Sequence, residues 1–200
     1  MLKDITPHFS SPITVCEIEE NTDMLKDEVT YIKSYNQEDS GYDEYRVLEK
    51  YPRIKKILLN EFNRFVKNKL HYTNEFIIST SWISATEKEE SCQFHCHRNS
   101  FYSGVYYFDE YNEETCGKIE FLNPLFNQSD FHLLAKEDSL YNLRSAIYTP
   151  KKKRLLFFPS YLLHGIRLHK DNTLRKSLAF NIVPIGKYGF GDSTYNTSWI

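Results

Sequence analysis

Apolar residues recur at helical spacing in one long stretch, from Tyr51 to Leu70. They place a single apolar stripe on one face of a helix, and the stripe comprises Ile54, Ile57, Leu58, Phe62, Phe65, Val66 and Leu70. Pro52 suits the first helical position, and lysines gather at the far end, where the helix dipole favours cations. The pattern predicts an amphipathic helix that packs on a sheet.

The rest of the N-terminal region is less regular. Residues 1–20 contain two prolines and are predicted to be extended. A second helix is predicted over Thr22–Lys33, where helical spacing relates Leu25, Val29 and Ile32. The polar segment Asn36–Glu44 contains a glycine and is predicted to be a loop.

Beyond Tyr72 the pattern changes to short runs rich in aromatic and β-branched residues, which predict strands. These are Glu75–Thr86, Gln93–His97, Ser103–Phe108, Lys118–Phe121, Arg154–Pro159, Leu162–Leu168 and Leu174–Val183. Asn123–Pro150 is a long, weakly patterned insertion. Helices followed by many short strands predict a mainly β fold with flanking α-helices, an antiparallel sandwich or jelly roll. We expect a single domain over 1–200, with 1–72 as extended and helical support and 73–200 as the jelly-roll core.

Composition supports this fold and narrows the function. Aromatic residues make up 16% of the 200 residues, and the net charge is -2, so no overall field favours nucleic acid or an anionic membrane. No apolar stretch approaches the roughly 20 residues of a membrane span, and the first residues lack the apolar centre of a signal peptide. We therefore expect free thiols at all four cysteines and a cytoplasmic location, the host cytoplasm if a phage encodes the chain.

The histidine pair His95 and His97 is the first candidate site. On a strand the side chains of Gln93, His95 and His97 share one face, with the two histidine Cα atoms about 7 Å apart, so both imidazoles can reach one metal ion. A structural zinc site in the pattern C-x-x-H-C-H is the rival interpretation. The same alternation argues against it, because Cys92 and Cys96 would point away from the histidine face.

The segment from Arg154 to Gly186 supplies the second candidate. It resembles a hairpin in which Leu168 faces Arg175 and His164 faces Ala179. Because directly opposed residues project to the same face, this register puts His164, Arg175 and Ser177 on one face. A guanidinium suits a carboxylate and a serine hydroxyl adds a hydrogen bond. A metal ligand beside such a clamp fits 2-oxoglutarate, which is both a chelator and a dicarboxylate. Alternatively, Arg175 is a surface strand residue.

Several fragments in order resemble a known family. "HCHRNSFYSGVYYF", "GKIEFLNP", "LLFFPSYLLHGI" and "LRKSLAFNI", together with "ITPHFSSPI" and the "SW" of Ser81–Trp82, are similar to the 2-oxoglutarate/Fe(II)-dependent oxygenases of the H-x-H…SGVYY type found in bacteria and phages. The resemblance spans most of the chain. It implies a double-stranded β-helix, a cupin-like jelly roll that holds iron at its open end.

The resemblance also implies roles for individual residues. His95, His97 and His164 would bind Fe(II) and carry catalysis, while Arg175 and Ser177 would clamp the 2-oxoglutarate carboxylate with help from Tyr107. The commonest site of this kind has two histidines and one carboxylate, whereas this chain has His97 in the third position. Either His97 completes a three-histidine site, or water or a carboxylate from elsewhere takes its place.

The sequence thus predicts a hydroxylating oxygenase that releases succinate and CO2, with Fe(II) as cofactor and 2-oxoglutarate as cosubstrate. Two alternatives stay open: a three-histidine cupin-type dioxygenase that uses no 2-oxoglutarate, and a jelly-roll binding or virion-associated protein whose metal is structural or absent. The substrate, small molecule or protein, is not specified by the sequence. We expect no membrane or nucleic-acid partner, and a homodimer is left open.

Overall fold

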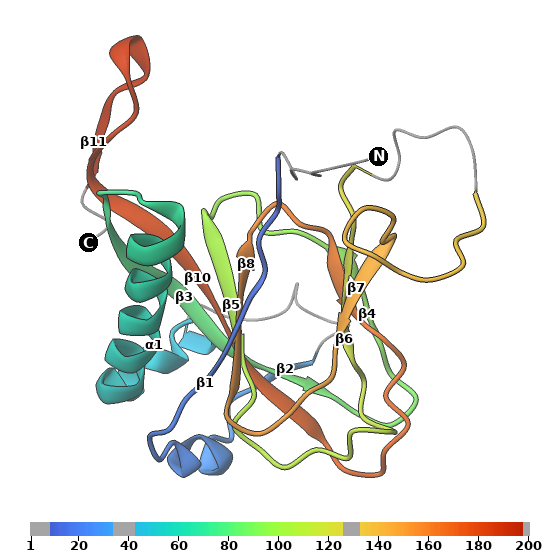
Figure 1. The fold of residues 1–200 in the computed structure, drawn as a ribbon. Coiled ribbons are helices and arrows are strands. Elements are labelled where there is room, and N and C mark those ends of the chain that lie inside the picture. The colour runs from blue at the N-terminus through green and yellow to red at the C-terminus, as the bar shows by residue number, and fades with distance from the viewer. Residues whose placement is uncertain (1–8, 34–42, 126–132, 198–200) are drawn as a thin grey trace.

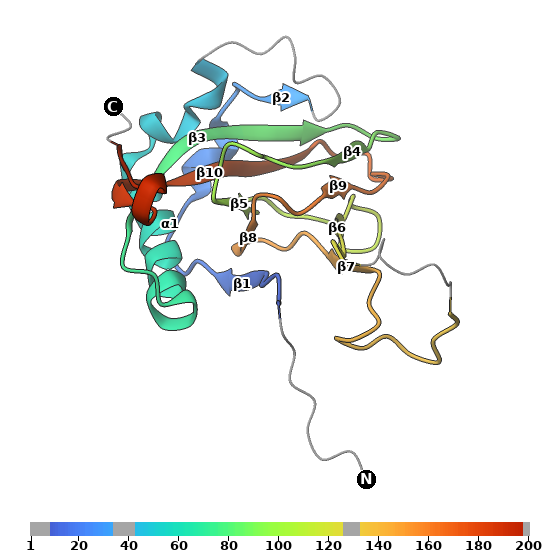
Figure 2. The same ribbon diagram turned by 90° about the horizontal axis from the view of Figure 1, so that it is seen from above.

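The computed structural model describes residues 9–33, 43–125 and 133–197 of the chain. Two β-sheets face each other, and the helix α1 (Pro52–Phe65) covers the outer face of the larger one (Figures 1 and 2). None of the helices in these ranges combines the length and hydropathy that crossing a bilayer requires.

The larger sheet has seven strands. Its order is β1 (Thr14–Glu17), β8 (Arg154–Pro159), β5 (Tyr102–Tyr106), β10 (Arg175–Tyr188), β3 (Glu75–Thr86) and β2 (Ile32–Lys33), and β11 (Tyr195–Thr197) pairs with the far end of β10. All pairs are antiparallel except β2 with β3. The hairpin of β10 and β11 projects beyond the two sheets (Figure 1).

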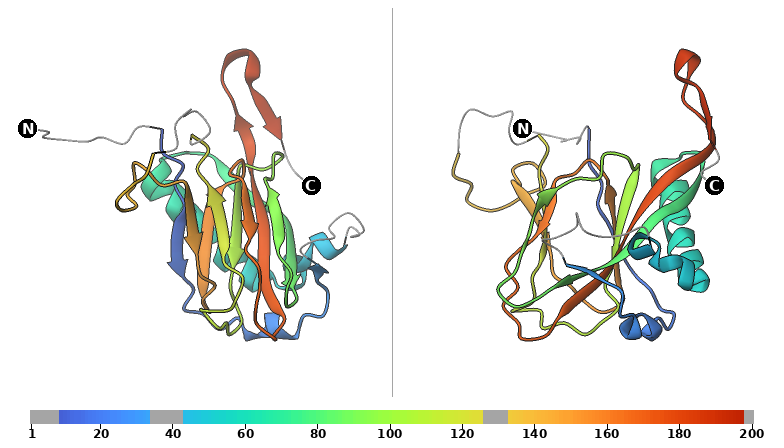
Figure 3. Two further views of the ribbon diagram at one scale, coloured as in Figure 1. Left: turned by 90° about the vertical axis from the view of Figure 1, so that its right-hand side faces the viewer. Right: turned by 180° about the vertical axis from the view of Figure 1, so that it is seen from behind.

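The smaller sheet has four strands in the order β4 (Cys92–His95), β9 (His164–Ile166), β6 (Ile119–Leu122) and β7 (Ser145–Tyr148), all antiparallel. Figure 3 shows this sheet facing the larger one from two further sides. The strand β7 lies inside the insertion Asn123–Pro150, where the sequence analysis expected no element. It is only four residues long, too short to produce a clear periodic pattern.

Strand alternation explains why both faces of the larger sheet are buried. On β8, Leu155 and Phe157 face the helix, whereas Leu156 and Phe158 face the smaller sheet. On β10, the helix side holds Leu178, Phe180 and Ile182. The intervening positions of β10 therefore point into the space between the sheets, and these are Arg175, Ser177 and Ala179.

The predicted long helix is confirmed. It starts at Pro52, buries the side chains of Ile54, Leu58, Phe62 and Phe65, and continues as a π-helical turn over Val66–Leu70. His71 ends it in the left-handed conformation with φ of 57°.

The predicted helix over Thr22–Lys33 is wrong. A short 3₁₀ helix spans Asp23–Asp27, and the chain then extends into β2. Val29 is 83% exposed although Leu25 is buried, so the spacing of these apolar residues does not correspond to one buried face. The predicted loop Asn36–Glu44 lies almost wholly outside the described residues.

The predicted hairpin of β9 with β10 is also wrong. The strand β9 pairs with β4 and β6 in the smaller sheet, while β10 pairs with β3 and β5 in the larger one. The connection crosses between the sheets and is anchored by His169, whose Nδ1 accepts from the Gly117 N–H at 3.1 Å and whose Nε2 donates to the Thr173 carbonyl at 2.7 Å. A polar turn in a sequence does not distinguish a hairpin from such a crossing.

Candidate metal centre and anion pocket

Cross-strand pairing brings the first two histidines together. His95 at the end of β4 lies directly opposite His164 at the start of β9, and their ring centroids are 4.5 Å apart. Directly opposed residues of an antiparallel pair project to the same face. Gly165 permits this close approach, since a Cβ there would lie 2.7 Å from the Cys92 carbonyl oxygen.

An irregularity in β4 changes the predicted faces of that strand. Cys92 pairs with Ile166 and His95 with His164, so three steps on β4 match two on β9. Cys92 consequently lines the same cavity as His95, with its Sγ 3.8 Å from His95 Nδ1. The prediction that Cys92 points away from the histidine face is wrong, because an extra residue resets the alternation.

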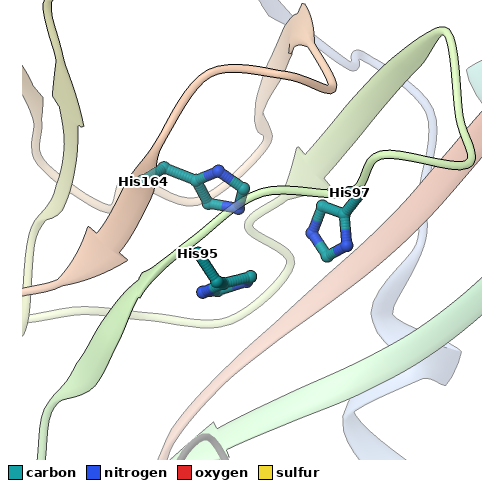
Figure 4. Close-up of side chains that lie close together, drawn as sticks. All are labelled: His95, His97 and His164. Carbon is teal, nitrogen blue, oxygen red and sulfur yellow. The ribbon is translucent and has the colours of Figure 1, made fainter.

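His97 joins the pair from the turn that follows β4. Its ring centroid lies 5.1 Å from that of His95 and 5.2 Å from that of His164. Figure 4 shows the three rings around a common space. The strand thus ends two residues before the predicted His97, but the rings converge all the same. One nitrogen from each ring lies within 4.8 Å of the others.

Hydrogen bonds to carbonyl groups orient two of the rings. His95 Nδ1 lies 2.9 Å from the Gln93 carbonyl oxygen, and His164 Nδ1 lies 2.9 Å from that of Leu162. Because a carbonyl oxygen only accepts, each Nδ1 carries the proton and each Nε2 keeps its lone pair. This is the arrangement that a metal-binding histidine uses to fix its tautomer.

Burial keeps the imidazoles of His97 and His164 neutral. Desolvation, together with repulsion from His95 and His97, lowers the pKa of His164 to about 3. The hydrogen bond to the Leu162 carbonyl acts in the opposite direction and raises this pKa, but it does not outweigh the desolvation. Desolvation and the charge of His95 lower the pKa of His97 to about 4. Metal binding requires unprotonated imidazole, so the rings of His97 and His164 fit a divalent ion such as iron without first losing a proton. In the described ranges, the ligand-type side chains clustered here are all histidines, which does not support the zinc pattern with Cys92 and Cys96.

Arg175 is the second feature of the cavity. It lines the same space as the histidines but is only 2% exposed, which excludes the surface-residue alternative. Its Nε donates to the Gly117 carbonyl at 2.8 Å, and its guanidinium lies 5.5 Å from the Tyr107 ring centroid. No carboxylate of the described residues forms an ion pair with it. A buried charge without a counterion is costly, so this cation is suited to an anionic ligand.

The two terminal nitrogens of Arg175 have only weak partners. Nη1 lies 3.4 Å from Ser177 Oγ and Nη2 lies 3.4 Å from the Tyr107 hydroxyl. Ser177 lines the cavity, whereas Tyr107 is fully buried behind the guanidinium and does not line it. Both long contacts involve neutral oxygens, which leaves donor capacity for a carboxylate. Desolvation raises the pKa of Tyr107 although Arg175 lowers it, so the phenol is neutral.

The histidines and Arg175 share a cavity for a reason other than the predicted one. His164 and Arg175 lie on facing sheets, and the inner faces of both sheets point into the space between them. Trp82 was not predicted as a site residue and Cys92 was considered only as a zinc ligand, yet both line the cavity. Trp82 was noted in the "SW" fragment, but only its contact in three dimensions gives it a role.

Residues 80–181 match the family model described as "Putative 2OG-Fe(II) oxygenase". No curated protein matches the chain by sequence.

Solved structures give the same result for the fold. HygX from Streptomyces hygroscopicus, with nickel, 2-oxoglutarate and hygromycin B bound, is 14% identical, with 87% of this chain and 83% of that chain covered and a TM-score of 0.57. A prolyl hydroxylase from Trichoplax adhaerens, in complex with a hypoxia inducible factor peptide fragment, is 11% identical over 86% and 83%, with a TM-score of 0.56. The predicted jelly roll is confirmed by these two likenesses.

A third match is more partial. An oxidoreductase of the 2OG-Fe(II) oxygenase family from Burkholderia pseudomallei is 14% identical, with a TM-score of 0.46. The match covers 60% of this chain, which spans only half the length of that protein.

Proposed function

This chain belongs to the 2OG-Fe(II) oxygenase family, and on that premise we propose that it hydroxylates a C–H bond of its substrate, with release of succinate and CO2. One observation carries the proposal: a single cavity combines three converging imidazoles with a buried guanidinium that lacks a carboxylate partner among the described residues. A divalent metal ion and a dicarboxylate are the two ligands that such a cavity satisfies together.

The residues have distinct roles in this proposal. His95, His97 and His164 hold Fe(II), and Arg175 and Ser177 bind the far carboxylate of 2-oxoglutarate. When bound, iron and 2-oxoglutarate supply the oxidising chemistry, in which O2 and 2-oxoglutarate are consumed as the substrate R–H becomes R–OH. The protein binds and orients both partners, so that the cosubstrate has one fixed end.

The guanidinium would bind the carboxylate through Nη1 and Nη2. Those nitrogens now make contacts of 3.4 Å with Ser177 and Tyr107, which a charged acceptor would replace by shorter, charge-assisted bonds. The Nε bond to Gly117 holds the plane of the group fixed meanwhile. Tyr107 does not line the cavity, so we propose that it helps to bind the carboxylate indirectly, by contact with the guanidinium from behind.

Apolar walls would keep bulk water away from the reacting centre. Val105 and Phe158 of the larger sheet and Ile119 of the smaller sheet line the cavity and are buried. Phe158 also packs against the ring of His164 at 4.7 Å between centroids. A dry cavity strengthens each charge interaction inside it.

A third imidazole in place of the usual carboxylate changes the charge of the site. Three neutral ligands leave the iron centre one charge more positive than two histidines and a carboxylate do. We propose that this favours the 2-oxoglutarate dianion. If His97 does not bind, His95 and His164 would hold the metal together with water or a carboxylate from elsewhere.

The proposal leaves the substrate class open. The protein of the hygromycin B complex and the prolyl hydroxylase share this fold but were captured with a small molecule and with a peptide, respectively. We place the enzyme in a reducing compartment such as the cytoplasm, because all four cysteines are free thiols and the iron must stay ferrous.

Anaerobic titration tests the function. We expect a visible absorption band that requires both Fe(II) and 2-oxoglutarate, and succinate formation once O2 and substrate are admitted. Iron binding without the band would favour a three-histidine dioxygenase that uses no 2-oxoglutarate. Absence of specific iron binding would instead favour a jelly-roll binding protein.

A further inference from the structure

The three imidazoles of the cavity are not held in the same way. His95 and His164 each bond through Nδ1 to the carbonyl oxygen two residues earlier. For His97, no hydrogen bond joins a ring nitrogen to any of the residues in 9–33, 43–125 and 133–197. The ring of the third ligand therefore depends on another contact for its orientation.

The backbone of His97, in contrast, is firmly anchored. Its N–H donates to the Ser160 carbonyl at 2.8 Å, and its carbonyl accepts from the Ser100 N–H at 3.2 Å. Ser160 is fully buried, and its hydroxyl lies 2.8 Å from that of Ser103, which donates to Asn181 Oδ1 at 2.8 Å. These polar residues come from three of the sequence fragments that mark the family. They fix the Cα of His97 but leave its side-chain torsions free.

Trp82 is the side chain that meets the free ring. It lies on β3 opposite Ala179 of β10, lines the cavity and is 5% exposed. Its ring and that of His97 are 5.6 Å apart between centroids at 61°, an edge-to-face arrangement that aromatic pairs prefer. Tyr45 packs behind Trp82 in a second edge-to-face contact at 5.7 Å. Trp82 is thus held from behind while it contacts His97.

We propose that Trp82 is a positioning residue that holds the His97 imidazole toward the metal, in place of the hydrogen bond that fixes the other two ligands. The proposal rests on the proposed function, because it presumes a metal bound by all three histidines. It also separates two kinds of ligand. His95 and His164 are oriented by hydrogen bonds to carbonyl oxygens, whereas among the described residues His97 is oriented by ring packing.

A purely structural role for Trp82 predicts something different. As a buried aromatic residue, it stabilises the fold whether or not His97 is present, and its loss would then weaken metal binding only through general loosening. A positioning role requires that the effect disappear when His97 is removed. The two roles therefore differ in the coupling between positions 82 and 97.

Cobalt(II) binding to the full chain measures that coupling. We expect Trp82→Leu to weaken Co(II) binding about tenfold, at the lower end of the effect of removing a group that orients a metal ligand. The visible Co(II) spectrum of Trp82→Leu should shift toward that of His97→Ala. In the His97→Ala background, Trp82→Leu should cause no further loss.

A matched control and a conservative variant keep the test decisive. Phe180 is a fully buried aromatic residue on the neighbouring strand whose side chain belongs to the core on the helix side, and among the described residues its ring contact is with Phe157 and not with a histidine. Phe180→Leu should destabilise the fold without changing the Co(II) spectrum. Trp82→Phe keeps an aromatic ring and should recover most of the affinity if Trp82→Leu folds poorly.

Three outcomes would overturn the inference. One is Co(II) binding by Trp82→Leu with wild-type affinity and spectrum. Another is that Trp82→Leu lowers the Co(II) affinity equally with and without His97. The third is that Phe180→Leu changes the Co(II) spectrum in the same way as Trp82→Leu. If wild-type protein binds no Co(II), or His97→Ala leaves its spectrum unchanged, the three-histidine centre itself fails. That result identifies the proposed site, and not the Trp82 contact alone, as the error.

Discussion

Replacement of Arg175 by methionine should separate stability from cosubstrate binding. Methionine has nearly the length of the arginine stem but carries no charge. In the wild-type protein Arg175 is 2% exposed, and its guanidinium has no carboxylate partner among the described residues. Its removal relieves a desolvation penalty of several kcal/mol.

The contacts of the guanidinium are lost as well, and two of them are the main offset to that relief. The charged donor bond from Nε to the Gly117 carbonyl is worth about 1.5–3 kcal/mol, and the contact with the Tyr107 ring about 0.5–2 kcal/mol. We therefore expect the free energy of unfolding of the ligand-free protein to stay level or rise by about 1 kcal/mol. Urea unfolding monitored by tryptophan fluorescence measures it.

Binding of 2-oxoglutarate should respond in the opposite direction. Removal of one partner of a buried charge pair costs about 3–5 kcal/mol, and each 1.4 kcal/mol changes the affinity about tenfold. The Arg175→Met variant should therefore bind 2-oxoglutarate at least about a hundredfold more weakly than wild type. Calorimetric titration of the Fe(II)-loaded or Co(II)-loaded protein measures this. Metal affinity itself should be unchanged, because Arg175 is not a metal ligand.

Arg167→Met is the matched control. Arg167 also forms two bonds, to Glu120 at 2.7 and 2.9 Å, but its side chain is 50% exposed, and such surface pairs contribute little. Arg167→Met should change neither the free energy of unfolding nor the affinity for 2-oxoglutarate appreciably. Affinity for 2-oxoglutarate within twofold of wild type in Arg175→Met would refute the clamp. A large loss of stability in the ligand-free variant would refute the argument that Arg175 is an uncompensated buried charge.

Three further predictions follow from the site. Co(II) at a hundred times its Kd should stabilise the wild-type protein by about 2.7 kcal/mol through mass action and so raise its melting temperature. His164→Ala should abolish that increase in melting temperature, and a normal increase would exclude His164 as a ligand. Gly165→Ala should destabilise the fold by about 1–3 kcal/mol and also weaken Co(II) binding. The reason is that the new Cβ would lie 2.7 Å from the Cys92 carbonyl oxygen and force β4 away from β9. Denaturation and metal titration that both match wild type would contradict this prediction. Cys92→Ser should leave Co(II) affinity within about threefold of wild type, since Cys92 is not one of the three clustered ligand-type residues, and a larger loss in titration would make the thiol a ligand.

The sequence predicted the elements with long, regular patterns. The apolar stripe of α1 and the alternation of β3, β8 and β10 follow from burial on one or both faces, which local sequence reports directly. The helix predicted around Leu25 failed because three apolar residues at helical spacing do not require one buried face, and Val29 is exposed.

The fold brings the predicted residues His95, His97, His164, Arg175 and Ser177 to one cavity, but not by the geometry that the sequence predicted. His164 and Arg175 were expected to share a face through a hairpin, whereas they meet because two facing sheets enclose one cavity. The shift between Cys92 and His95 is a tertiary adjustment to β9, which no local periodicity records. Trp82 could not be assigned either, since its contact with His97 joins segments that only the fold brings together.

The claim on which the account depends is that His95, His97 and His164 bind one metal ion. Crystals of the Fe(II) protein, grown and measured without oxygen, test it directly by anomalous diffraction at the iron edge. We predict one peak about 2.0–2.2 Å from a nitrogen of each of the three imidazoles. A peak that is bound by none of them, or by only two with His97 turned away, would contradict the three-histidine centre.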